Sequence, residues 1–126
     1  MAVYIIAEAG VNHNGRLDLA LRLCDVAKAA GVDAVKFQTW KTEKIVTQTA
    51  AKATYQVENT HSNEETQFDM LKKLELSYRQ FFEIKEYCDK IGIDFLSTPD
   101  EEDSLDFLVS LHLPFLKIGS GEVNNI

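Results

Sequence analysis

The sequence has few basic residues, no long apolar run and no basic leader. Thirteen Lys and Arg stand against 20 Asp and Glu in 126 residues, which gives a formal net charge of −7. This balance argues against a nucleic-acid partner, because neutralising phosphates needs a basic face. No apolar run approaches the roughly 20 residues that a membrane span needs, and nothing resembles a signal peptide. We therefore expect no nucleic-acid or membrane partner, although a few lysines inside a pocket can still bind an anionic small molecule.

Cysteine is also scarce, with only Cys24 and Cys88 in the chain. Both lie in segments of helical periodicity, where a thiol is more often a small buried apolar group than half of a disulfide or a metal ligand. This usage predicts a reducing, cytoplasmic setting.

Apolar runs and helical patterns alternate along the chain. Short apolar runs predict four strands, at residues 3–7, 34–39, 93–97 and 113–118. Helical patterns separate them, at residues 17–30, after the capping boxes Ser62-x-x-Glu65 and Ser77-x-x-Gln80, and after a third box at Thr98-Pro99-x-Glu101. Strands that are separated by helices pair in parallel through right-handed crossovers.

This order predicts an α/β fold and fits both an open doubly wound sheet and a barrel. A complete (β/α)8 barrel needs roughly 250 residues. Four βα units in 126 residues therefore favour the N-terminal half of a TIM barrel, with about four parallel strands and flanking helices. We expect residues 1–126 to form a single partial domain. We also expect self-association into a homo-oligomer, because a half barrel leaves strand edges unpaired.

Two of the predicted helices have a clear apolar face. In residues 17–30 it comprises Leu19, Ala20, Leu23, Val26, Ala27 and Ala30, with Gly31 as the C-cap. The helix opened by Ser77 carries Phe81, Ile84, Cys88 and Ile91 at helical spacing and ends at Gly92.

Polar residues interrupt the apolar strands near their carboxyl ends. They are Glu8, Lys36, Gln38, Ser97, Thr98 and Lys117, and Ser120 and Glu122 follow the last strand. In parallel α/β folds this edge of the sheet carries the active site. A lysine between apolar neighbours is costly to bury unless it meets an anion. Lys36 and Lys117 therefore predict a pocket for a phosphate or a carboxylate.

Several polar residues also have a structural interpretation. Thr98 has the spacing of a helix N-cap, Ser120 suits a turn, and Glu8 and Glu122 suit ion pairs with the lysines. His13, within Asn-His-Asn-Gly, is interpreted as support for a turn rather than as a metal ligand. Residues 41–63 are long for a strand–helix connection, which favours a functional loop. Asn59 in this loop is a candidate sugar or dimer contact.

Four motifs, in order, resemble those of the sialic acid synthase family. They are IAEAGVNHNG at residues 6–15, VKFQT at 35–39, FLSTP at 95–99 and KIGSGE at 117–122. The resemblance spans essentially the whole chain, and four ordered motifs are far more specific than any one of them.

The resemblance implies condensation of phosphoenolpyruvate with an N-acetylated sugar aldehyde, such as N-acetylmannosamine, to a nonulosonic (sialic) acid, with release of phosphate. It also implies a divalent metal, Mn²⁺, as cofactor, and a dimer. By resemblance, the residues that bind phosphoenolpyruvate would be Lys36, Thr98, Lys117 and Ser120. Glu122 and Glu8 would serve catalysis, and Glu8 and Gln38 would line the sugar or metal side.

The sequence departs from the family pattern in two ways. The acidic run 100–103 follows the third motif where relatives usually carry Phe-Asp. The family's metal-binding histidines lie on later strands, and its C-terminal antifreeze-like domain follows them, so we expect this chain to be incomplete for turnover. Two alternatives stay open: another phosphoenolpyruvate or sugar-phosphate barrel enzyme, such as a Schiff-base aldolase, or a non-catalytic half barrel that pairs with itself.

Overall fold

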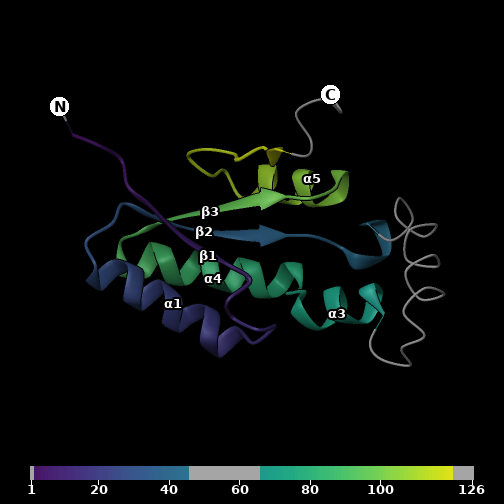
Figure 1. The fold of residues 1–126 in the computed structure, drawn as a ribbon. Coiled ribbons are helices and arrows are strands. Elements are labelled where there is room, and N and C mark those ends of the chain that lie inside the picture. Colours follow the sequence, from purple (N-terminus) through teal and green to yellow (C-terminus); the bar gives the residue numbers. More distant parts are fainter. Residues whose placement is uncertain (1, 46–65, 121–126) are drawn as a thin grey trace.

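The computed structural model describes residues 2–45 and 66–120, and it contains one sheet of three parallel strands. The strands lie in the order β1-β2-β3, with bounds Ile6–Gly10, Ala34–Thr39 and Asp94–Pro99 (Figure 1). Glu8 pairs with Lys36 across β1 and β2, and Gln38 pairs with Thr98 across β2 and β3. The parallel order, with helices between the strands, confirms the α/β prediction.

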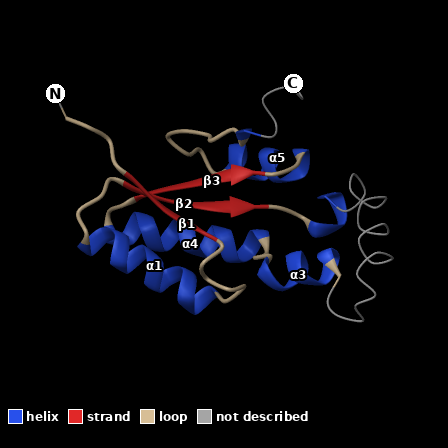
Figure 2. Ribbon diagram, in the orientation of Figure 1, coloured by secondary structure: helices blue, strands red, loops and turns tan. Residues whose placement is uncertain are grey.

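Helices pack against one face of this sheet. They are α1 (Leu17–Ala29), α4 (Tyr78–Ile91) and α5 (Glu102–Ser110), and α3 (Gln67–Leu74) precedes α4 in the chain and has no buried residue. Figure 2 shows α1 and α4 running side by side along the strands, with α5 beside β3. The core joins Phe37 of β2 and Phe95 of β3 to Phe81 and Ile84 of α4 and Leu108 of α5. No described helix is long and apolar enough to span a bilayer.

The pleat of β2 separates the core from the candidate site. Val35, Phe37 and Thr39 are buried on the helix-covered face, whereas Lys36 and Gln38 lie on the opposite face and are half-buried. We call this opposite face, with Glu8, Lys36, Gln38, Leu96 and Thr98, the site face. On the core side the hydroxyls of Thr39 and Ser97 form a buried hydrogen bond of 2.6 Å.

Local capping signals define α4 as the sequence predicts. The Ser77 hydroxyl accepts from the Gln80 N–H, and the Gln80 side chain accepts from the Ser77 N–H. Gly92 ends the helix with φ of 80°, in the left-handed region that suits glycine. The helix before it, α3, begins at the N-cap Thr66, and the predicted box at Ser62 lies outside the described residues.

The first strand begins three residues later than predicted. Val3 is 77% exposed, and the Ile5 N–H donates to the Asp33 carboxylate (2.7 Å) instead of to a neighbouring strand. Glu8 is therefore the third of five residues in β1 and does not end the strand. Ile6 is 45% exposed, so β1 is not buried on both faces.

The buried face of α1 differs from the predicted one. Ala20, Cys24 and Ala27 are buried, whereas Val26 is 62% exposed. Small side chains let α1 approach α4 closely, so that Cys24 Sγ lies 3.5 Å from Cys88 Sγ. Both thiols are free and buried, which confirms their interpretation as small apolar groups.

The helix α5 does not begin at Thr98, so the predicted cap is wrong. Thr98 and Pro99 remain in β3 because the ladder with β2 continues to the Thr39–Pro99 pair. The N-cap is Glu101, whose carboxylate accepts from the Ser104 N–H (3.2 Å). The acidic residues Glu102 and Asp103 occupy the first turn, where the helix dipole favours negative charge.

The fourth predicted strand is not formed. Residues 113–118 have no ladder to β3, and Phe115, Leu116 and Ile118 are each more than 40% exposed. This segment nevertheless contacts distant residues at both of its ends. The Phe115 ring packs edge-on against the Tyr4 ring, with 5.3 Å between centroids, and Gly119 lies near the Thr98 methyl. The apolar residues of this segment are typical of a strand, but a strand also needs hydrogen bonds to a partner strand, and these residues do not make them.

Candidate functional site

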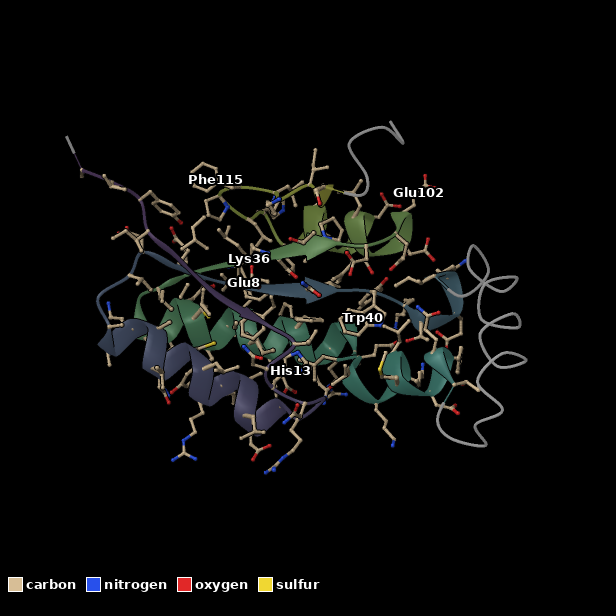
Figure 3. The ribbon with its side chains drawn as sticks, viewed as in Figure 1. Glu8, His13, Lys36, Trp40, Glu102 and Phe115 are labelled. Atoms are coloured by element: carbon tan, nitrogen blue, oxygen red, sulfur yellow. The ribbon has the colours of Figure 1, made fainter. Side chains whose placement is uncertain are left out.

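Three polar side chains from three strands meet on the site face. The Lys36 ammonium lies 2.7 Å from Glu8 Oε2 and donates to Thr98 Oγ1 at 2.9 Å. The Lys36 side chain is 11% exposed and the Glu8 side chain is 52% exposed. Figure 3 shows Glu8 and Lys36 next to each other on β1 and β2. The structure thus confirms the structural interpretation of Glu8 as the ion-pair partner of a lysine.

Local backbone geometry explains how these groups meet. Parallel register sets Glu8 directly beside Lys36, and Thr98 lies on the same face of β3, diagonal to Lys36. The register shifts between Glu8 and Gly10, a bulge at which Gly10 adopts φ of 54°. A Cβ at Gly10 would lie 3.2 Å from Glu8 Oε1. Glycine at this position therefore leaves room for the carboxylate that pairs with Lys36.

The cluster has the chemistry of an anion site. An ammonium carries three donors, and among the described residues Glu8 and Thr98 receive two of them. The remaining donor, together with the Thr98 hydroxyl and the neighbouring Gln38 amide, suits a phosphate or carboxylate oxygen. Gln38 is half-buried opposite Thr98 on the site face.

The other predicted site residues do not join this cluster in the structure. Lys117 is exposed, and its ammonium donates to the carbonyl of Ile118 at 2.9 Å. The prediction that Lys117 is buried in a strand is therefore wrong, because the fourth strand is not formed. Ser120 is exposed at the end of the described segment. Glu122 and Asn59 lie outside the described residues.

His13 supports the turn after β1, as predicted. Its Nδ1 accepts from the Gly15 N–H (2.9 Å), and its ring stacks on Phe37 with 6.1 Å between centroids. The side chain is fully buried, and Nε2 has no hydrogen-bond partner in the part of the chain that the structure describes. Because Nδ1 accepts, the neutral ring carries its hydrogen on Nε2. Burial lowers the pKa of His13 below its ordinary value of 6.5.

We expect this histidine to make stability depend on pH. The unfolded chain takes up a proton near pH 6.5, whereas the folded protein resists it because the pKa of His13 is lowered. The free energy of unfolding should therefore be highest above about pH 7 and fall as the pH drops through 6.5, by up to about 1.4 kcal/mol per pH unit. Urea unfolding between pH 5.5 and 7.5 measures this slope.

A neutral side chain at position 13 removes the effect. His13→Gln should flatten this part of the slope. An equal slope in the wild type and in His13→Gln would contradict the assignment.

Two carboxylates accept backbone hydrogen bonds where the chain leaves β2, a role that the sequence did not indicate for either of them. The Lys41 N–H donates to Glu101 Oε1 (2.9 Å), and the Thr42 N–H donates to Glu75 Oε1 (2.8 Å). The bonded residues are 60 and 33 positions apart, so no local pattern announces them. The Lys41 ammonium also lies over the Tyr78 ring, 4.2 Å from its centroid.

No group of three or more His, Cys, Asp and Glu side chains that could hold a metal ion occurs among the described residues. The site-face cluster, with one carboxylate and one ammonium, does not fit a divalent cation either. This cluster therefore suits an anion rather than a metal.

The chain is similar in sequence to proteins named as synthases of acidic sugars. The chain is 50% identical to an N,N'-diacetyllegionaminic acid synthase of Legionella pneumophila over 126 residues, which are 100% of this chain and 35% of that protein. It is 38% identical to the human N-acetylneuraminate-9-phosphate synthase over 97% of this chain and 33% of that one. The chain thus spans about a third of the length of these curated relatives.

A solved structure of a sialic acid synthetase is also similar to this chain. The N-acetylneuraminic acid (sialic acid) synthetase of Leptospira borgpetersenii, in complex with citrate, superimposes with a TM-score of 0.77 at 34% identity. The match covers 99% of this chain and 39% of that one, and it confirms the fold class predicted as the N-terminal half of a barrel. The NeuB family matches residues 23–126. The chain therefore belongs to the NeuB family.

Proposed function

We propose that this chain carries part of the phosphoenolpyruvate site of a nonulosonic acid synthase. The reaction is the condensation of phosphoenolpyruvate with an N-acylated sugar aldehyde, such as N-acetylmannosamine, with release of phosphate. The names of the relatives, which are synthases of legionaminic, neuraminic and pseudaminic acids, support a product of this class. Because the chain spans about a third of these relatives, turnover is proposed for a longer protein.

The observation that carries the proposal is the nearly buried Lys36 ammonium beside Thr98. A cation on the site face, held by one carboxylate and one hydroxyl, attracts the phosphate or carboxylate of phosphoenolpyruvate through charge-assisted hydrogen bonds. Glu8 holds Lys36 in place and, being half exposed, can turn toward the aldehyde or a water. Lys117 and Ser120 would have to approach this cluster to complete the donor site.

In the proposed reaction, C3 of phosphoenolpyruvate attacks the aldehyde carbon and forms the new C–C bond. Water then adds at C2, and the C2–O bond to phosphate breaks, which gives a 2-oxo acid and inorganic phosphate. Lys36 and Thr98 bind the donor throughout, and Lys36 stabilises negative charge as phosphate leaves. Glu122, which lies outside the described residues, is proposed for proton transfer, and Gln38 and Asn59 for contact with the sugar.

The divalent metal, proposed to be Mn²⁺, would need ligands beyond the described residues, and a homodimer is likewise proposed. A Schiff-base aldolase is less well supported, because its lysine must be an uncharged amine and Lys36 is engaged in an ion pair with Glu8.

The test is calorimetric titration of phosphoenolpyruvate into this chain, with and without MnCl₂. We expect saturable binding that Lys36→Met weakens by about tenfold to a hundredfold, the range for loss of a hydrogen bond to a charged group. Methionine keeps the apolar stem and removes the charge, and half-exposed Glu8 can be solvated by water.

The matched control is Lys44→Met, which removes an exposed lysine that pairs with Asp103. It should leave the affinity unchanged. Equal affinity of Lys36→Met and wild type, or no binding by a chain that circular dichroism shows to be folded, would refute the donor site. A folded, non-binding chain that is dimeric would favour the self-associating half barrel.

A further inference from the structure

Two carboxylates from different helices hold adjacent backbone amides at the end of β2. Glu101, the N-cap of α5, accepts from Lys41, and Glu75, the C-cap of α3, accepts from Thr42. Thr42 is the first residue of a helical turn, and Lys41 directly precedes it, so both carboxylates bind amides at the N-terminal end of this turn, where backbone N–H groups lack partners within the helix. We call Glu75 and Glu101 the carboxylate clamp.

The clamp extends the ladder between β2 and β3 beyond its last residue pair. The ladder ends at Thr39 and Pro99, and the Asp100 N–H then donates to the Thr39 carbonyl at 3.0 Å. Glu101 follows at once and binds Lys41 as the chain turns into α5. The clamp therefore ties the exit of β2 to the exit of β3, where Gln38 and Thr98 lie.

Both carboxylates are surrounded by donors. The Glu75 side chain is 8% exposed and also accepts from the Thr42 hydroxyl (2.8 Å) and from Lys72 (3.3 Å). Glu101 also accepts from the N–H and the hydroxyl of Ser104, which is fully buried. Buried carboxylates persist only where donors satisfy them, and such charge-assisted bonds are strong. The clamp is thus a rigid anchor.

We propose that Glu75 and Glu101 are positioning residues for the candidate site. They hold the end of β2, with Lys36 and Gln38, in register with Thr98 on β3, and they do not touch the donor themselves. The part that concerns donor binding rests on the proposed function.

Amide hydrogen exchange and donor affinity, measured on the same variants, test the clamp. In Glu101→Ala the Lys41 amide should exchange about tenfold faster or more, because a bond to a charged acceptor is lost. Phosphoenolpyruvate should bind several-fold more weakly, while circular dichroism is unchanged. Glu101→Gln keeps an acceptor oxygen and should restore most of both. Glu75→Ala should act in the same way on the Thr42 amide.

The control is Glu102→Ala, which removes an exposed carboxylate from the same helical turn. Unchanged exchange at Lys41 and Thr42, or unchanged donor affinity despite faster exchange, would overturn the positioning role. If the wild type binds no phosphoenolpyruvate, the proposed function fails, and the clamp is judged on the amide chemical shifts of Gln38 and Thr98. These should move in Glu101→Ala but not in Glu102→Ala, and unmoved shifts would overturn the clamp as well.

Discussion

Replacing Gly15 with alanine should destabilise the protein by roughly 2 to 5 kcal/mol. Gly15 has φ of 74°, and a Cβ there would lie 1.9 Å from the carbonyl oxygen of Lys73. The left-handed conformation alone costs an alanine about 1–2 kcal/mol. The clash adds an overpacking cost of about 1–3 kcal/mol, because a backbone carbonyl near the end of α3 must move. Urea unfolding, followed by the fluorescence of the buried Trp40, measures the loss.

Gly31→Ala separates the two contributions. Gly31 has φ of 80°, and nothing lies within 4 Å of its Cβ position. The loss at this position should therefore stay near the conformational cost of about 1–2 kcal/mol. Equal losses at Gly15 and Gly31 would show that the turn after β1 does not pack tightly against α3.

Replacing Phe37 with alanine should cost about 3–5 kcal/mol, the range for emptying a buried aromatic site. Phe37 is fully buried at the centre of the core. Its ring centroid lies 5.9 Å from that of Phe95, 6.4 Å from that of Phe81 and 6.1 Å from that of His13. Partial collapse around the cavity cannot restore all of these contacts, because three different elements supply them.

Phe82→Ala is the matched comparison. Phe82 is 47% exposed on α4, one residue after the buried Phe81, so its loss should be about 1 kcal/mol or less. The same urea experiment gives both values. A loss at Phe37 as small as that at Phe82 would contradict the aromatic core.

Features set by neighbouring residues could be predicted from the sequence. The capping box at Ser77 and the left-handed Gly92 define α4 as expected, because their hydrogen bonds join residues three or four positions apart. The strand 34–39 has the predicted bounds, since its β-branched and aromatic residues are flanked by polar segments. Lys36 was recognised as a candidate site residue because a charge among apolar neighbours requires partners.

Features that depend on distant partners could not be predicted in this way. The start of β1 depends on the Asp33 side chain, and residues 113–118 lack the ladder that would make them a strand. Because this ladder is missing, Lys117 is exposed and not buried in a strand. Thr98 has the spacing of a helix cap, but its pairing with Gln38 keeps it in β3. Nothing near Glu75 or Glu101 in the sequence indicates that their carboxylates accept hydrogen bonds from the backbone amides of Thr42 and Lys41, respectively.

The alternation of β2 has a consequence for how this segment can change in evolution. Phe37 lies in the core and Lys36 on the site face only because successive side chains point in opposite directions. A shift of the register of Ala34–Thr39 by one residue would invert both faces at once, turning an ammonium into the core and an aromatic ring toward the donor. The strand can thus accept point substitutions one at a time, but its register within the sheet is fixed by the chemistry on its two faces.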